Sequence, residues 1–203
     1  MDSRNWKSVL DYYKWHLCFL LLVVVCVVFV LASVTTSYEA DLCVGYIGLQ
    51  TGYMDTQKFN DNKPDIEKLL KDSTGDGDRY AEIYVYNANK KKEALNLLEE
   101  MIEAEGYHIY IAPKDTFLSH ENKSDFATLL TPKGNVETIS DSNGRIYAVS
   151  LEGNTYIEML GLRDTTGLYI AAANFEDEEL TDYEKNGINI ANFIVESRKN
   201  YNK

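Results

Sequence analysis

The fold of this chain is decided by the stretch RYAEIYVYNANKKKEALNLLEEMIEAEGYHIYIAP, residues 79–113. Its first eight residues alternate small or branched apolar residues with polar and aromatic ones, which predicts a strand. Residues 90–105 then place apolar side chains at helical spacing, and a glycine ends the pattern. Residues 107–112 predict a second strand. A strand, a helix and a strand in this order predict two parallel strands joined by a crossover helix. The apolar stripe of the helix consists of Ala94, Leu98, Met101 and Ile102.

Outward from this unit, the sequence predicts more elements of the same kind. The others are a strand at 41–48, a helix at 53–71 broken near Pro64, short helices within 115–130, a loop at 133–144, strands at 145–151 and 167–174, and a helix at 181–199. Thr181 and Glu184 have capping-box spacing at the start of the last helix, and Ile190, Phe193 and Ile194 form its apolar stripe. We therefore expect an α/β protein with one mainly parallel sheet, in which the later strands are free to run antiparallel, flanked by helices.

The N-terminal segment predicts a membrane anchor. Residues 17–34 are almost purely apolar, and a helix of about 18 residues rises about 27 Å, close to the thickness of a bilayer core. Basic residues precede the segment and acidic residues follow it. These flanks predict a cytoplasmic tail at 1–16, one span of the cell membrane at 17–36 and an extracytoplasmic domain at 38–203. A cleaved signal peptide is the alternative, although its apolar region would be shorter.

Charge and cysteine usage exclude several classes of function. The chain carries a formal net charge of −12, and its first 37 residues hold three basic and two acidic residues, so the rest carries −13. Such a charge argues against binding to nucleic acid or docking on anionic lipid. Only Cys43 lies outside the apolar segment, which argues against a disulfide framework. No catalytic triad, metal-ligand cluster or phosphate-binding loop is recognisable in the sequence, so we expect no enzyme.

Part of the chain resembles one lobe of the bacterial extracellular solute-binding proteins. The stretch EALNLLEEMIEAEGYHIYIAPKDTF, residues 93–117, is similar to their sequence of a helix ending in glycine, a strand, a loop and an aromatic residue. The preceding stretches DSTGDGDRYAEIYVY and DLCVGYIG occupy the places of the first two strands of such a lobe. The segment DYYKWHLCFLLLVVV also resembles a group of single-pass membrane proteins of Gram-positive anaerobes. The resemblance covers about residues 41–130 and implies a single lobe that binds a small solute.

The expected ligand site lies where the parallel strands end. Ligands of open α/β sheets bind outside the carboxyl ends of the strands, and amide, hydroxyl and tyrosine side chains suit a sugar, a peptide or another small polar solute. Ordinary loop residues are the alternative interpretation. The candidate ligand-binding residues at that edge are Gln50, Thr51, Tyr53, Asn87, Asn89 and Asp115.

An acidic loop is the candidate metal site. The stretch DSTGDGD spaces Asp72, Thr74, Asp76 and Asp78 as oxygen ligands at alternate positions, as in an EF-hand loop. The twelfth position from Asp72 is an isoleucine, where an EF-hand requires a bidentate glutamate. Two interpretations remain open, a structural Ca²⁺ site and an Asp/Gly turn between a helix and a strand. No other cofactor is expected.

Two functions of different classes agree with these patterns. The first is a membrane-tethered, extracytoplasmic, non-enzymatic binding module for a small polar solute. The second is an accessory or scaffold subunit of a membrane protein complex that binds no small ligand. A solute-sized polar crevice favours the first, and an exposed apolar patch favours the second.

Overall fold

The computed structural model describes residues 12–16, 18–27, 40–49, 54–175 and 180–197. The chain divides into two compact units, Met1–Glu39 and Ala40–Lys203. In the first unit, residues 12–16 and 18–27 are helical and their side chains are exposed. Half of the predicted span at 17–36, residue 17 and residues 28–36, lies outside the described residues. Among the residues that are described, no helix is both long enough and apolar enough to cross a membrane.

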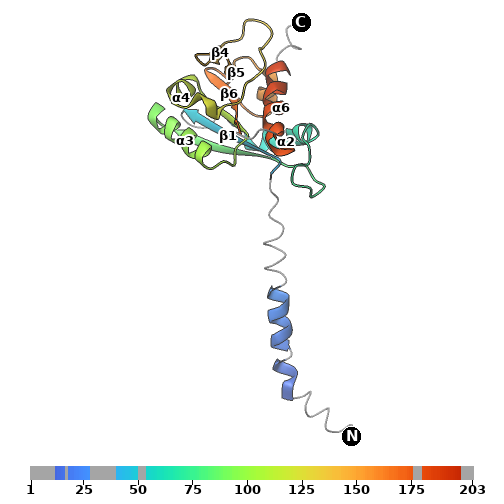
Figure 1. The fold of residues 1–203 in the computed structure, drawn as a ribbon. Coiled ribbons are helices and arrows are strands. Elements are labelled where there is room, and N and C mark those ends of the chain that lie inside the picture. Colours follow the sequence, from blue (N-terminus) through green and yellow to red (C-terminus); the bar gives the residue numbers. More distant parts are fainter. Residues whose placement is uncertain (1–11, 17, 28–39, 50–53, 176–179, 198–203) are drawn as a thin grey trace. The chain divides into compact units, whose positions relative to one another are not determined.

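The second unit is built on one mixed six-stranded sheet (Figure 1). The strands lie in the order β2-β1-β3-β6-β5-β4. β1 pairs parallel with both β2 and β3, whereas the β3–β6, β5–β6 and β4–β5 pairs are antiparallel. The α/β class and the antiparallel later strands are therefore confirmed, but the expectation of a mainly parallel sheet is wrong. The strands are β1 (Leu42–Leu49), β2 (Ala81–Ala88), β3 (Ile109–Pro113), β4 (Thr138–Ser140), β5 (Ile146–Ser150) and β6 (Leu168–Ala172).

Helices cover both faces of the sheet, as the labels of β1, α3 and α6 in Figure 1 let the reader follow. Because successive side chains of a strand point to opposite faces, the sheet builds two separate apolar clusters. The first cluster lies under α2 (Thr56–Glu67), α5 (Thr155–Met159) and α6 (Asp182–Ser197). The second lies under α3 (Lys91–Glu103) and α4 (Lys114–Ser119), followed by the 3₁₀ turn η1 (Lys123–Asp125).

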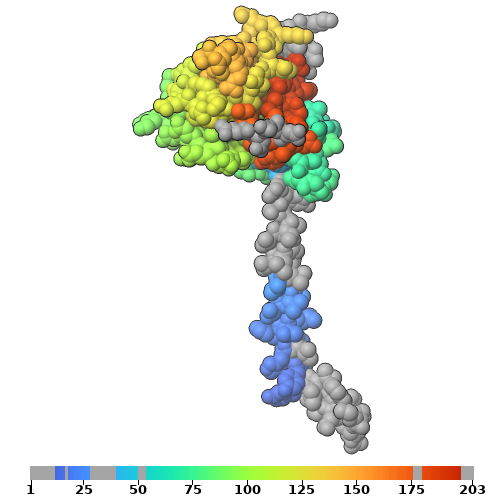
Figure 2. Space-filling view, viewed as in Figure 1, coloured from blue at the N-terminus to red at the C-terminus, as the bar shows by residue number. Residues whose placement is uncertain are grey.

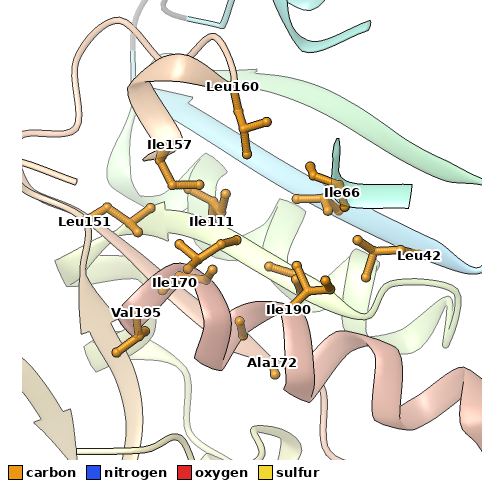
Figure 3. Close-up of a cluster of buried hydrophobic side chains, with 14 of the residues drawn as sticks. Leu42, Ile66, Ile111, Leu151, Ile157, Leu160, Ile170, Ala172, Ile190 and Val195 are labelled. Atoms are coloured by element: carbon orange, nitrogen blue, oxygen red, sulfur yellow. The ribbon is translucent and has the colours of Figure 1, made fainter. Parts of the chain in front are cut away.

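The first cluster fixes α6 against the middle of the sheet (Figure 3). Ile111 of β3 and Ile170 of β6 face Ile190 of α6, and each of the three is at most 3% exposed. In the space-filling view, α6 (red) lies beside the segment that contains α2 (teal) on the same face of the domain (Figure 2). This packing holds the start of α6 at one edge of the sheet, where the candidate site is found.

Several local predictions are confirmed, and others need correction. The buried side of α3 consists of Ala94, Leu98 and Met101, as predicted. Pro64 does not break its helix: it lies inside α2, because that helix buries Phe59 and Ile66 on either side of it. Phe193 was predicted to be buried in the stripe of α6 but is 38% exposed. The short elements β4 and α5 were not predicted.

Candidate functional site

A cleft of about 480 Å³ opens at the edge of the sheet where β3 begins. It lies between the end of α3, the start of β3, the residues after β6 and the start of α6. Because β6 runs antiparallel to β3, the carboxyl end of β6 meets the amino end of β3 here. The volume is within the usual range for small-molecule sites. The lining residues are Ile102, Glu105, Tyr107, Tyr110, Asp125, Ala173, Asn174, Phe175 and Glu184.

The chain turns sharply to bring α3 to this edge. Glu105 has a φ of 52°, a left-handed conformation that only a few non-glycine residues adopt. Its N–H donates to the carbonyl of Ile102 at 3.1 Å, which is one of the two hydrogen bonds of a Schellman motif after the C-cap residue Ala104. Tyr107 comes two residues later, and its hydroxyl lies 2.5 Å from the hydroxyl of Tyr86 on β2. The turn therefore places one carboxylate and one aromatic ring at the mouth of the cleft.

Tyr110 is the central polar group of the cleft. It is 3% exposed and lies on β3 among the second apolar cluster, with its ring edge-on to Phe126. Among the described residues its hydroxyl has no hydrogen-bond partner, although it lines the cleft. Burial, and then the negative charge of Asp125, raise the pKa of Tyr110. The hydroxyl therefore stays protonated at neutral pH and is available to a ligand in the cleft.

Two of the carboxylates are held in place by their own hydrogen bonds. Asp125 lies 2.7 Å from Nε2 of His120 and accepts from the side-chain amide of Asn122 at 2.6 Å. Oε2 of Glu184 accepts from the N–H of Thr181 at 2.5 Å and from its hydroxyl at 2.8 Å. These bonds confirm the predicted capping box, and they leave Oε1 of Glu184 without a partner in the described part of the chain.

A buried neutral histidine supports the wall of the cleft. His108 is fully buried, and its Nδ1 accepts the N–H of Cys43 at 2.9 Å, which joins the start of β3 to β1. Its Nε2 has no partner among the described residues. Burial lowers the pKa of His108 to about 4, and the negative charges of Asp41 and Glu184 only partly oppose this. The ring lies edge-on to Tyr183, 4.0 Å between centroids, so the imidazole is held rigidly in its neutral form.

The sequence-predicted ligand residues lie away from this cleft. Gln50, Thr51 and Tyr53 fall outside the described residues. Asn87 is exposed and still part of β2, while the backbone N–H of Asn89 donates to Glu93 at 2.7 Å. The structure pairs Asp115 with Lys91. The structure therefore does not bring these described residues together with the lining of the cleft, and binding by them remains a prediction.

The acidic loop before β2 uses its carboxylates to hold its own backbone. Asp72 accepts the N–H groups of Gly75 at 2.7 Å and of Gly77 at 3.0 Å, and Asp76 accepts the N–H of Asp78 at 2.9 Å. Thr74 donates to Asp72 at 3.4 Å. Across the described residues, this loop included, no group of three or more His, Cys, Asp or Glu side chains is placed to hold a metal ion. The geometry is that of the Asp/Gly turn, and Ca²⁺ binding stays an untested prediction.

A neighbouring carboxylate anchors this loop to the sheet. Asp41, directly before β1, accepts the N–H and the hydroxyl of Ser73, both at 2.7 Å, and the N–H of Tyr80 at 2.9 Å. Burial raises the pKa of Asp41, but these hydrogen bonds together outweigh it and the pKa is lowered. The loop therefore lies at the amino edge of β1 and β2.

Sequence reasoning missed the residues that form the cleft. His120, in the segment 115–130 that the sequence predicts as short helices, is 7% exposed and partners Asp125. One signal was present in the sequence: Tyr110 stands between Ile109 and Ile111 in an apolar strand, and a polar group in a fully covered strand needs a partner.

Comparisons of the chain with protein-family models, with curated proteins and with solved structures found no match.

Proposed function

We propose that the chain is a membrane-tethered, extracytoplasmic binding module, without enzymatic activity, that holds a small polar solute in the cleft beside Tyr110. The single observation that carries the proposal is this solute-sized cleft, with the unpartnered hydroxyl of a 97% buried tyrosine in its wall. This hydroxyl can donate a hydrogen bond to a ligand in the cleft and accept one from it, in place of water. The membrane tether rests on the apolar segment 17–34 and its charged flanks.

Binding suits the chemistry of the cleft better than catalysis does. A protonated phenol donates and accepts hydrogen bonds but is a poor base. Cys43 lies on β1, and its N–H donates to His108. The pKa of the Cys43 thiol is raised to about 11 by burial and by the charge of Glu82. A thiol of that pKa is almost entirely protonated at neutral pH and is a weak nucleophile. The polar groups of the region are therefore placed to recognise a solute.

The test is a calorimetric titration of the full chain, held in detergent micelles, with sugars, amino acids, amines and short peptides. Tyr110→Phe removes one hydroxyl and is expected to weaken binding by about 3- to 10-fold, as one hydrogen bond contributes about 0.5–1.5 kcal/mol. Tyr147→Phe is the matched control, because Tyr147 is 1% exposed on β5 and does not line the cleft. No binding by any probe, or equal loss in both variants, contradicts the proposal.

A specific surface favours the scaffold function as the second candidate. Leu130 is 51% exposed, Met159 39% and Phe193 38%. Leu130 is held beside α6 by its N–H, which donates to Asn192 at 2.8 Å, and the ring of Phe193 contacts Tyr156 after the start of α5. Contiguous exposed apolar side chains mark protein contact sites, and Leu130 and Phe193 both lie on or beside α6. If Phe193→Lys abolishes crosslinking to a membrane protein while solute titrations stay flat, the scaffold function is the correct one.

A further inference from the structure

We infer that the cleft recognises a small organic cation, a molecule that carries at least one alkylammonium or guanidinium group. This inference rests on the proposed function and names the ligand class of the same site. It comes from the charges that line the cleft, from the polar atoms that remain unpaired there, and from the spacing of its carboxylates.

The charges that line the cleft have one sign. Glu105, Asp125 and Glu184 line it, and none of the described lining residues is basic. Two basic side chains of this part of the domain, Lys123 and Arg145, bind groups other than these carboxylates. Lys123 donates to the backbone carbonyl of Phe117 at 2.7 Å and to that of Leu118.

The second cation near Asp125 is bound in the same way. Arg145 pairs with Asp141 and donates to the backbone carbonyls of Phe126 and Lys123. The carboxylates of the cleft are thus not neutralised by lysine or arginine among the described residues.

His120 is the side chain that contacts Asp125 through its ring. Its Nε2 lies 2.7 Å from Asp125, while its Nδ1 is buried and has no partner among the described residues. The side-chain partners of Asp125 in the described part of the chain are therefore a histidine and an asparagine, and neither a lysine nor an arginine pairs with it.

The unpaired polar atoms of the cleft can all accept hydrogen bonds. Oε1 of Glu184 and the hydroxyl of Tyr110 have no partners in the described part of the chain. The side-chain nitrogen of Asn174 donates to the carbonyl of Ser124 at 2.8 Å, which leaves its oxygen as an acceptor. Tyr107 and Phe175 add aromatic rings to the lining, and cations bind favourably over such rings. An ammonium or guanidinium group offers only donors and fits this set.

The spacing of the carboxylates selects an organic cation and not a metal ion. No three acidic or metal-ligating side chains among the described residues converge on one point. The three carboxylates come from the end of α3, from η1 and from the start of α6, around a cleft of about 480 Å³. Ca²⁺, for example, needs six to eight oxygen ligands within about 2.6 Å. An amine with an alkyl body can instead extend between carboxylates on different sides of the cleft.

The test compares three probes of the same length on the full chain in detergent micelles: 1,5-diaminopentane, 1,5-pentanediol and glutarate. Calorimetry should show binding of the diamine at least about 10-fold tighter than binding of the diol, and no binding of glutarate. The diamine affinity should fall when salt is raised from 50 to 500 mM, because screening weakens charge recognition. A lysine blocked at both ends of its backbone is the fourth probe. If it binds more tightly than 1,5-diaminopentane, the recognised cation is a lysine side chain, and if it binds more weakly, the recognised cation is a free amine.

Two charge-removing variants complete the test. Glu184→Gln keeps the capping box, which accepts Glu or Gln, but removes the charge, and we expect the diamine affinity to fall about 10-fold or more. Glu121→Gln removes one exposed acidic charge outside the cleft lining and should leave the affinity within about 2-fold.

The possible failures of this test are distinguishable. If the diol or glutarate binds as tightly as the diamine, and Tyr110→Phe weakens that binding, the cation inference is overturned while the proposed binding function stands. If no probe of any charge binds at millimolar concentration, both fall. Equal losses in Glu184→Gln and Glu121→Gln would show that only the net charge matters, and would also overturn the inference.

Discussion

His108 should make the domain lose stability between pH 6.5 and pH 4. An ordinary histidine has a pKa near 6.5, and burial lowers the pKa of His108 to about 4 in the folded state. The fold therefore favours the neutral ring: the stabilisation is complete above pH 6.5 and is lost as the pH falls towards 4. At about 1.4 kcal/mol per pH unit, the loss between pH 7 and pH 4 is about 3 kcal/mol.

The substitution His108→Asn isolates this effect. An asparagine oxygen can still accept the N–H of Cys43, but the side chain does not titrate. Urea unfolding of the full chain in non-ionic micelles, followed by the near-ultraviolet circular dichroism of tyrosine, should show a steep loss for the natural chain and a much flatter one for the variant. His16→Asn is the control, since His16 is exposed in the N-terminal helix. Asp41 loses its own contribution only below its ordinary pKa of 3.8.

The result that refutes this reasoning is a parallel pair of curves. If His108→Asn and the natural chain lose stability equally between pH 6.5 and pH 4, the imidazole takes up its proton without cost. The ring would then have an acceptor or water at Nε2, and the rigid neutral wall described for the cleft would be wrong.

Three further substitutions test the fold around the site by their urea midpoints. Gly161→Ala should cost about 2 kcal/mol or more, because φ is 110° and a Cβ would lie 2.5 Å from the carbonyl oxygen of Asp55; an unchanged midpoint would contradict the close approach. Asn154→Ala should cost about 2–4 kcal/mol, since this buried side chain caps α5 at two N–H groups and donates to the carbonyl of Ile194 at 2.9 Å; a loss below about 1 kcal/mol would mean that water replaces it. Asp41→Asn should cost about 1–3 kcal/mol at pH 7, because one of its oxygens becomes a donor facing other donors; equal stability would show that the acidic loop is anchored by other contacts.

Local patterns were enough to predict the elements of the first half of the domain. The strand, helix and strand of residues 79–113 correspond to β2, α3 and β3, because alternation and helical spacing record directly which side chains face the sheet. The capping box at the start of α6 was also predicted, since both of its partners lie within one helical turn. Such features depend on neighbours in the sequence and on little else.

Non-local pairing was beyond the same patterns. β6 pairs antiparallel with β3, with Tyr110 opposite Ala171. The apolar pattern of a short strand is the same for parallel and antiparallel pairing, so the pattern does not predict the direction of β6. Pro64 stays in α2 because packing of the flanking apolar residues outweighs a local preference. The cleft needs residues from α3, β3, β6 and α6 at once, so no window of sequence contains it.

The mixed sheet explains why the candidate site lies at the edge opposite to the expected one. In a parallel sheet, all carboxyl ends meet at one edge, and the rule for ligand sites selects that edge. Here β6 reverses, so its carboxyl end and the start of α6 meet the amino end of β3. Carboxyl ends of strands therefore lie at both edges of the sheet: those of β1 and β3 at one edge and that of β6 at the other. The two sites are separable by substitution: Tyr110→Phe should weaken solute binding and Asp115→Ala should leave it unchanged. The reverse outcome would move the site to the carboxyl edge of β1 to β3, where the sequence alone places it.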